Sequence, residues 1–305
     1  MNVFISTTTF GVYSKAPLKE LRKYGIRHFL NPFKRKLSEH EIKSILKKKN
    51  YTGLIAGTEA LNAKVLSFAP SLRVISRVGV GLDNIDLKRA AKQNIKIYNT
   101  PDVLTDVVAE LSLGLMLCCL RKISSHDARM HKGMWQKEMG TLLKGRTLGI
   151  IGLGRIGKRV AQLAKAFGAD IIFYDKKPLR NSQYKSVKLN TLLKNSDIIS
   201  LHCATGDQII SKSQISMMRK GVCIINTSRG TIINENALYN GLKSGKVGSA
   251  GLDVFNDEPY SGKLTKVQNV VLTSHIGSYA KEARVQMEMQ AVNNLIKGLK
   301  KAGLL

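Results

Sequence analysis

A Gly-x-Gly-x-x-Gly motif at residues 152–157 constrains the fold of this chain more than any other feature of its sequence. An apolar run typical of a buried strand, Leu148–Ile151, leads directly into the motif, and a segment with helical spacing of apolar side chains follows it. A second apolar run, Ile171–Tyr174, then ends at Asp175. The motif alone is a weak signal, but this context predicts a strand–turn–helix–strand unit of a parallel α/β fold.

Each glycine of the motif has a physical task in the binding of a dinucleotide. Gly152 permits a tight turn, Gly154 lets the backbone approach a pyrophosphate, and Gly157 allows the helix to pack closely on the strand. The pyrophosphate is expected at the helix N-terminus, where free amide groups and the helix dipole favour negative charge. The predicted contacts in this loop are Gly152, Gly154, Arg155, Ile156 and Gly157.

The acid after the second strand indicates which dinucleotide is bound. Asp175 lies about 20 residues past the glycines, where a carboxylate can accept hydrogen bonds from the ribose hydroxyls of adenosine. A carboxylate there would repel a 2′-phosphate, so NAD is favoured over NADP. Lys176 and Lys177 weaken this preference because they bring positive charge to the same place.

Short apolar runs rich in β-branched residues alternate with segments of helical spacing along most of the chain, which is the pattern of parallel α/β sheets. Pro101 disfavours helix just before it and breaks this alternation. A strongly apolar helix is predicted from Asp102 to Leu120, with Asp102 as its N-cap. The last predicted helix, at about 281–299, is long enough to return to the first domain.

The sequence therefore predicts an α/β protein with two Rossmann-like domains, each a doubly wound parallel sheet. A flavodoxin-like substrate-binding domain is expected at residues 1–99 and 282–305. It is discontinuous around an inserted NAD-binding domain at residues 100–281.

Composition excludes several classes of function. The net charge of +28 comes from lysines that are spread thinly, without interleaved aromatic residues or a nucleic-acid motif, so it predicts a solvated surface and no nucleic-acid partner. The longest charge-free apolar stretch, Leu111–Leu120, is about half the length of a membrane-spanning helix. The four cysteines lack metal-ligand spacing, and the N-terminus lacks the pattern of a signal peptide. We expect a cytoplasmic protein with no bound metal and no membrane contact.

Several motifs in a fixed order resemble those of the D-isomer-specific 2-hydroxyacid dehydrogenases, and of these the phosphoglycerate dehydrogenases most. Besides the glycine motif they are Arg77–Asp86, Asn99–Pro101, Val108–Leu111, Lys132–Trp135, Ile225–Gly230, Leu252–Phe255 with Glu258–Pro259, and Thr273–Gly277. The resemblance covers nearly the whole chain and is weakest before about Gly53. It implies a short form of the enzyme without a regulatory domain after Leu305.

The resemblance implies a catalytic triad of Arg229, Glu258 and His275. Oxidation of an alcohol needs a base for the hydroxyl proton, and His275 just follows a predicted strand, at the sheet edge where α/β sites form. Glu258 would pair with His275, favour the imidazolium and fix the ring tautomer. The planar fork of Arg229 would hold a substrate carboxylate and polarise the 2-oxygen.

Further site residues also follow from the resemblance. His202, Thr227, Asp253 and Gly277 are expected to contact the cofactor, with Asp253 at the nicotinamide carboxamide. The other expected substrate-binding residues, beside Arg229 and His275, are Arg77, Val78 and Gly79. The tight turn Val78–Gly81 is expected to offer backbone amides to the substrate carboxylate.

The substrate stays open between two small acids. Oxidation of 3-phosphoglycerate to 3-phosphohydroxypyruvate, a step of serine biosynthesis, is the first expectation, and reduction of glyoxylate, hydroxypyruvate or another 2-keto acid is the alternative. The segment Ile55–Glu59 has no arginine for a phosphate, and Glu59 would oppose one. A lower alternative is an NAD-sensing binding protein. A homodimer is expected because the predicted helix 102–120 is too apolar to face water.

Overall fold

The computed structural model describes residues 1–101, 103–177, 182–203 and 207–305, and it divides into two compact units. Unit 1 comprises Met1–Leu104 and Ser278–Leu305, and unit 2 comprises Thr105–Gly277. The expected domain limits at residues 99 and 281 differ from this division by five and four residues. Asp102, the expected N-cap, lies outside the described residues.

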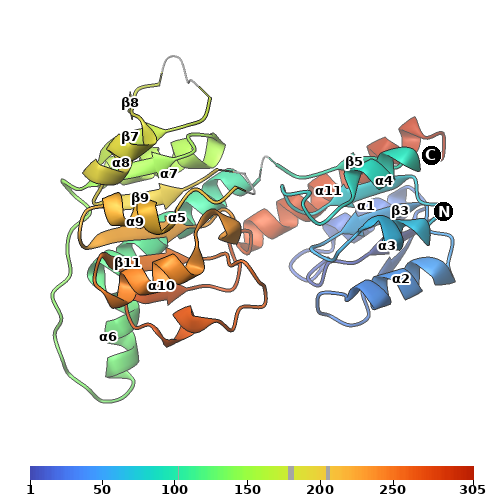
Figure 1. Cartoon of the computed structure of the whole chain (residues 1–305). Helices are drawn as coiled ribbons and strands as arrows, with labels where there is room; N and C mark the ends of the chain where they lie inside the picture. The colour runs from blue at the N-terminus through green and yellow to red at the C-terminus, as the bar shows by residue number, and fades with distance from the viewer. Residues whose placement is uncertain (102, 178–181, 204–206) are drawn as a thin grey trace. The chain divides into compact units, whose positions relative to one another are not determined.

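Unit 1 is built on a five-stranded parallel sheet in the order β2-β1-β3-β4-β5 (Figure 1). This order is that of flavodoxin-like sheets, so the predicted fold class is confirmed. Its strands are β1 (Asn2–Ile5), β2 (Arg27–Leu30), β3 (Gly53–Ala56), β4 (Val74–Arg77) and β5 (Lys96–Tyr98). Its helices are α1 (Ala16–Lys23), α2 (Glu39–Lys48), α3 (Ala63–Ser67), α4 (Leu87–Lys92) and α11 (Lys281–Lys301).

The C-terminal helix α11 joins unit 1 although about 180 residues separate it from β5 along the chain. Two glycines allow this close packing. A Cβ at Gly53 would lie 2.7 Å from Leu295 Cδ1, and one at Gly298 would lie 2.8 Å from Val74 Cγ1. The Ser76 hydroxyl on β4 also donates to the Ala291 carbonyl at 2.8 Å.

Local signals fix where several helices of unit 1 begin. Ser38 and Glu41 form a reciprocal capping box at the start of α2. Asn62 and Asp86 accept from the backbone amides of Val65 and Arg89, which caps α3 and α4.

Unit 2 is built on a seven-stranded parallel sheet in the order β12-β11-β10-β9-β6-β7-β8 (Figure 1). Its strands are β6 (Thr147–Ile151), β7 (Asp170–Tyr174), β8 (Lys185–Ser186), β9 (Ile198–Leu201), β10 (Val222–Asn226), β11 (Val247–Leu252) and β12 (Val270–Leu272). Its helices are α5 (Leu104–Arg121, whose first residue lies in unit 1), α6 (Ile123–Met130), α7 (Arg155–Ala166), α8 (Leu189–Asn195), α9 (Lys212–Met217) and α10 (Glu235–Lys243), with short 3-10 turns η1 (Gly230–Ile232) and η2 (Lys263–Lys266).

The side on which the chain adds successive strands to this sheet changes between β6 and β9. Strand β6 pairs with β7 on one side and with β9 on the other, so the sheet grows outward in both directions from β6. Ligands of doubly wound sheets bind outside the carboxyl ends of the strands at such a switch point. The glycine motif lies there because it directly follows β6.

Two hydrophobic cores cover the two faces of the unit 2 sheet. Side chains alternate between them along one strand: Cys223 and Ile225 belong to one core and Ile224 to the other. Helices α5 and α7 contribute to the first core, and α8, α9 and α10 to the second. The strands are buried on both faces, which explains why they read as continuous apolar runs.

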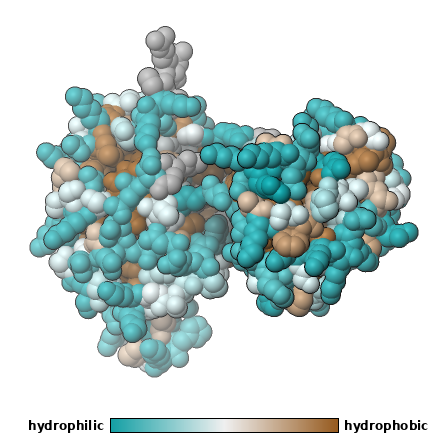
Figure 2. All heavy atoms as spheres, turned by 45° about the vertical axis from the view of Figure 1, so that its right-hand side comes forward, coloured by the Kyte–Doolittle hydropathy of each residue, from teal (hydrophilic) through white to brown (hydrophobic). Residues whose placement is uncertain are grey.

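The surface carries the lysine excess. Figure 2 shows hydrophilic residues over most of the face in view, with smaller hydrophobic patches between them. In the described part of the chain, no helix combines the length and the apolar character needed to cross a membrane.

Candidate active site

In the glycine loop after β6, neighbouring atoms leave no room for a side chain at two of the three glycines. Gly152 has a φ of +92°, and a Cβ there would lie 2.8 Å from the Cys203 amide nitrogen. A Cβ at Gly157 would lie 2.1 Å from the Gly152 carbonyl oxygen, so only glycine lets α7 pack on the turn. A Cβ at Gly154 would meet no heavy atom within 4 Å. Its position therefore has open space in front of it, which suits the approach of a pyrophosphate.

The start of α7 is suited to an anion. Gly154 is its N-cap residue and has no side chain that could bond the first amides of the helix. Arg155 and Ile156 open the helix, and the Lys158 amide is the first to bond back, to the Gly154 carbonyl at 2.9 Å. These features fit the diphosphate of a dinucleotide.

The Asp175 carboxylate is tied to the glycine loop. Its Oδ2 accepts from the Leu153 amide at 2.8 Å, and its Oδ1 accepts from the Lys177 amide at 3.0 Å. Lys176 Nζ pairs with Asp207 at 2.9 Å, and this exposed contact raises the pKa of Lys176. Asp175 therefore lies where the ribose is expected. The charge of the neighbouring Lys176 is partly offset by its pairing with Asp207.

His202 follows β9 across the switch point from the glycine loop. Its Nε2 lies 2.7 Å from the Ser200 hydroxyl, and burial lowers its pKa to about 4, so the ring is neutral at physiological pH. Its Nδ1 is buried and has no hydrogen-bond partner among the described residues, which exclude 204–206 close by. A Cβ at Gly152 would lie 2.9 Å from the His202 carbonyl carbon, so this residue borders the glycine loop as predicted for a cofactor contact.

The depressed pKa of His202 should make unfolding depend on pH. The unfolded chain has the ordinary value near 6.5 and binds more protons than the folded chain between pH 6.5 and about 4. The free energy of unfolding should therefore fall as the pH is lowered through this window, by up to about 3 kcal/mol from this group. We expect His202→Asn to lose this part of the dependence in urea unfolding, and the exposed His131→Asn to keep it. Equal pH dependence of wild type and His202→Asn would contradict the prediction.

Glu258 and His275 are in direct contact. His275 Nδ1 lies 2.7 Å from Glu258 Oε2, and Glu258 Oε1 accepts from the Phe255 amide at 3.1 Å. The acid is thereby fixed by the backbone and holds the Nδ1 side of the imidazole. This leaves Nε2 as the ring atom that can exchange a proton with a substrate oxygen.

Asp253 positions the loop that carries His275. Its buried Oδ1 accepts from the Thr273 hydroxyl at 2.6 Å and from the Ile276 amide at 2.8 Å, and Oδ2 accepts from the Gly277 amide at 2.8 Å. His275 has a φ of +56°, and these bonds on both sides hold it in that conformation. Sequence reasoning missed this role. An acid at the end of a buried strand was the available signal, because buried carboxylate oxygens must be paired. The nicotinamide contact of Asp253 stays a prediction.

Arg229 lies on the turn after β10. The Asn226 side chain fixes this turn, since Oδ1 accepts from the Ser228 amide at 3.1 Å and Nδ2 donates to the Arg229 carbonyl at 2.9 Å. A Cβ at Gly230 would lie 2.0 Å from the Phe255 carbonyl carbon. The turn with Arg229 therefore packs directly on the backbone that leads to Glu258.

The carboxyl edge of the unit 2 sheet thus carries most of the predicted site. Arg229 follows β10, Glu258 follows β11, and His275 follows β12. Thr227 also follows β10, and its Oγ1 lies 2.8 Å from the Ser112 hydroxyl of α5. Within the described residues no cluster of three or more His, Cys, Asp or Glu could hold a metal ion.

In unit 1 the prediction that the turn Val78–Gly81 offers amides to a carboxylate is wrong for its first two residues. The Val78 amide donates to the Ala56 carbonyl at 2.9 Å, and the Gly79 amide donates to the Thr100 hydroxyl at 2.8 Å. Both residues are buried, so neither amide can serve a carboxylate. The following residues of the same turn are more accessible, since Val80 is exposed and Gly81 is half-buried.

Arg77 and Glu59 are both engaged within unit 1. Arg77 Nη1 donates to the Val78 carbonyl at 2.9 Å, and the guanidinium fills the space beside Gly79. Buried Glu59 accepts from the Ser6 hydroxyl at 2.5 Å and from the Gly57 amide at 3.2 Å, and burial raises its pKa. Glu59 therefore stabilises the turn after β3, in the segment that lacks a phosphate-binding arginine.

Comparisons with known proteins agree with this geometry. The family model of the NAD binding domain of D-isomer specific 2-hydroxyacid dehydrogenases matches residues 113–277. A glyoxylate reductase of Thermococcus litoralis is 42% identical over 78% of this chain and 77% of its own length, and a hydroxypyruvate reductase of Thermotoga maritima is 42% identical over 81% and 84%. A D-3-phosphoglycerate dehydrogenase of Archaeoglobus fulgidus is 38% identical over 78% of this chain but only 48% of its own length.

A solved structure extends the likeness to both units. The TT0316 protein from Thermus thermophilus matches with a TM-score of 0.91 and 32% identity, over 99% of this chain and 97% of that protein. The NAD-binding domain, the predicted cofactor and the predicted enzyme class are confirmed by the family match. The chain belongs to the D-isomer-specific 2-hydroxyacid dehydrogenases and is an NAD-dependent oxidoreductase that acts on the CH–OH group of its substrates.

Proposed function

We propose that this enzyme reduces small 2-keto acids with NADH, with glyoxylate and hydroxypyruvate as its substrates. The likeness to reductases of these two acids, over most of their length as well as of this chain, carries the proposal. The acid at position 59 supports it, because the Glu59 carboxyl occupies the turn after β3 and offers no positive charge to a phosphate. The alternative substrate of the sequence analysis is therefore preferred to 3-phosphoglycerate.

The residues at the carboxyl edge of unit 2 can carry out this reduction. NADH, when bound, supplies a hydride to the carbonyl carbon. His275 would donate a proton to the keto oxygen through Nε2, and Glu258 would stabilise the imidazolium before that transfer. Arg229 would bind the substrate carboxylate and polarise the keto oxygen.

A substrate panel tests the proposed specificity. We expect kcat/KM for glyoxylate and hydroxypyruvate to exceed that for 3-phosphohydroxypyruvate by at least about tenfold, because an unpaired phosphate loses charge-assisted bonds. The rates would be measured as loss of NADH absorbance at matched substrate concentrations. A preference for the phosphorylated acid would return the assignment to the oxidation of 3-phosphoglycerate. Loss of NADH with another 2-keto acid alone would place the enzyme elsewhere in the same family.

We further propose that the enzyme is a homodimer. Helix α6 and the segment after it project from the sheet layers of unit 2 (Figure 1). They expose large apolar side chains, which in a monomer would face water. These are Ile123, Met130, Met134, Trp135, Met139 and Leu142. Sedimentation at micromolar concentration should give a dimer, and Trp135→Glu should shift it toward monomer. A wild-type monomer would contradict this assembly.

A further inference from the structure

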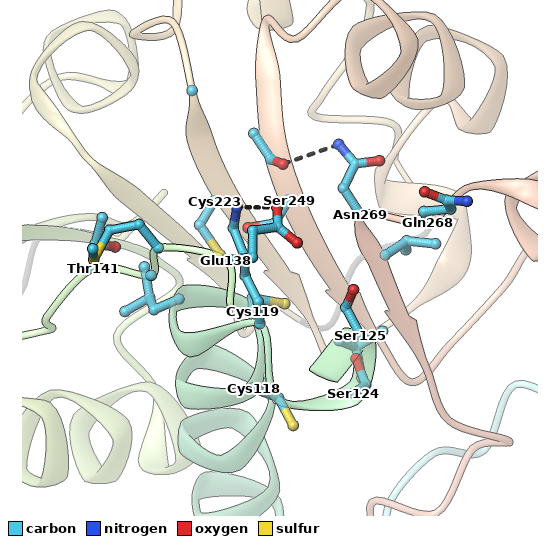
Figure 3. Close-up of a pocket in the computed structure, with 18 of the residues that line it drawn as sticks. Cys118, Cys119, Ser124, Ser125, Glu138, Thr141, Cys223, Ser249, Gln268 and Asn269 are labelled. Carbon is cyan, nitrogen blue, oxygen red and sulfur yellow. Dashed lines mark hydrogen bonds and ion pairs between the residues drawn. The ribbon is translucent and has the colours of Figure 1, made fainter. Parts of the chain in front are cut away.

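A cavity of about 390 Å³ lies in unit 2 at the amino ends of β9 to β12, opposite the catalytic residues (Figure 3). Glu138 in its wall is paired with cations from the start of α6 and from within that helix. It accepts from Lys122 and, at 2.8 Å, from Arg129 Nη2. These pairs tie the segment after α6 back to the helix. A further acid–base pair, Lys176 and Asp207, lies at the other end of the sheet, beside the cofactor loop.

Lys176 directly follows Asp175, the acid expected at the adenosine ribose. Asp175 is fixed in place by two backbone amides. Its Oδ2 accepts from the Leu153 amide at 2.8 Å, and its Oδ1 accepts from the Lys177 amide at 3.0 Å. The backbone turn that these bonds stabilise contains Lys176 as well. The Lys176 side chain therefore starts at the ribose end of the predicted cofactor site.

The Lys176 ammonium is engaged by an acid from a different segment of unit 2. Its Nζ lies 2.9 Å from Asp207 Oδ2. Lys176 follows β7, whereas Asp207 lies between β9 and α9. Strands β7 and β9 flank β6 in the sheet, and the end of β6 carries the glycine loop. The pair therefore joins the two segments that follow the strands on either side of β6.

The local charge at this place differs from that of the whole chain. The chain has 49 Lys and Arg but only 21 Asp and Glu, and its net charge is +28. NADPH differs from NADH by a 2′-phosphate, which carries about −1.5 to −2 charges. A strongly positive surface would by itself favour NADPH. At the ribose end, however, Asp175 and Asp207 offset the charges of Lys176 and Lys177 one for one.

We propose that Asp207 makes the enzyme selective for NADH over NADPH by holding the Lys176 ammonium. Lysine binds phosphate as a point charge, so a released Lys176 would be a partner for a 2′-phosphate. While Lys176 is bonded to Asp207, a 2′-phosphate must first break that pair, and the Asp207 carboxylate also repels it. The 2′-hydroxyl of NADH requires neither change. This selectivity depends on the cofactor alone and not on the proposed keto acid substrate.

Equilibrium binding of NADH and NADPH to the full chain tests the proposal. The fluorescence of the reduced nicotinamide gives both dissociation constants without any substrate. Wild type should bind NADH more tightly than NADPH. Asp207→Asn should lower the Kd for NADPH by about three- to tenfold, because Lys176 is released and one repelling charge is lost. The same substitution should change the Kd for NADH by less than about twofold, because NADH has no phosphate at this position.

The double variant Lys176→Met/Asp207→Asn shows whether Asp207 acts through Lys176. If it does, most of the gain in NADPH affinity should vanish in the Lys176→Met background, because the two effects are then coupled. The gain in Asp207→Asn should also shrink at about 1 M salt, where the Debye length is ~3 Å. A change in the local fold alone would show neither the coupling nor this dependence on salt.

Asp170→Asn is the matched control. Asp170 pairs with Lys165 Nζ at 3.5 Å, both side chains are exposed, and Asp170 opens β7 at the end away from the glycine loop. Both dissociation constants should keep their wild-type values, and circular dichroism would show that each variant is folded. Tighter binding of NADPH than of NADH by wild type, an unchanged Kd for NADPH in Asp207→Asn, an equal change for both cofactors, or the full gain in the double variant would each overturn the proposal.

Discussion

His275→Gln is expected to lower kcat for the reduction of hydroxypyruvate by about 10²–10⁴-fold, which is the usual contribution of a positioned general acid. Glutamine preserves polarity but cannot donate a mobile proton to the keto oxygen. The KM for NADH should change little, because the imidazole contacts Glu258 rather than the glycine loop. Steady-state rates of NADH loss give both constants. An exposed histidine, His131→Gln, serves as the matched control and should retain wild-type rates.

Glu258→Gln separates proton donation from positioning in the same experiment. The glutamine side chain can still form hydrogen bonds with the His275 ring and with the Phe255 backbone amide. It lacks the negative charge that favours the imidazolium. The kcat for reduction should therefore fall, but by less than in His275→Gln, because the proton donor itself is still present. If His275→Gln retained kcat within about threefold of wild type, His275 would not be the general acid.

Arg229→Lys carries the second large expected effect. Lysine keeps the positive charge but lacks the planar fork that binds a carboxylate through two hydrogen bonds. We expect kcat/KM for glyoxylate and hydroxypyruvate to fall by about 10²–10³-fold, with both KM and kcat affected. The dissociation constant of NADH, measured by fluorescence, should be nearly unchanged.

The control for Arg229 is an arginine of similar chemistry away from the site. Arg219 pairs with Asp197 at 2.9 Å near the opposite edge of the sheet, and Arg219→Lys should leave the kinetics unchanged. Wild-type kcat/KM in Arg229→Lys would show that substrate carboxylates are held elsewhere. An equal loss in both lysine variants would indicate a general effect on the fold.

The parallel sheets could be predicted because their central strands are buried on both faces and read as apolar runs. Strand β2, Arg27–Leu30, was not predicted. It lies at the sheet edge with partly exposed side chains, so it lacks such a run. The two-residue strand β8 at the other sheet's edge, Lys185–Ser186, is fully polar and was missed for the same reason. Such edge strands form because they pair with a neighbouring strand, and the local sequence does not indicate this pairing.

Site residues could be predicted where the order of the strands fixes their position. They could not be predicted where hydrogen bonds to distant residues decide whether a group is accessible. The ends of β10, β11 and β12 share one edge, so Arg229, Glu258 and His275 could be expected there. The engagement of the Val78 and Gly79 amides depends on Ala56 and Thr100, which are distant along the chain. These two amides are therefore unavailable to a substrate, which no local sequence pattern reveals.

The configuration of the product from hydroxypyruvate tests the central claim most directly. The enzyme would be incubated with NADH and hydroxypyruvate, and the glycerate formed would be separated on a chiral column. We predict stoichiometric loss of NADH with formation of D-glycerate alone, and neither change with His275→Gln. Formation of L-glycerate, or no NADH loss with hydroxypyruvate, glyoxylate or any other 2-keto acid, would contradict a D-specific reductase built on Arg229, Glu258 and His275.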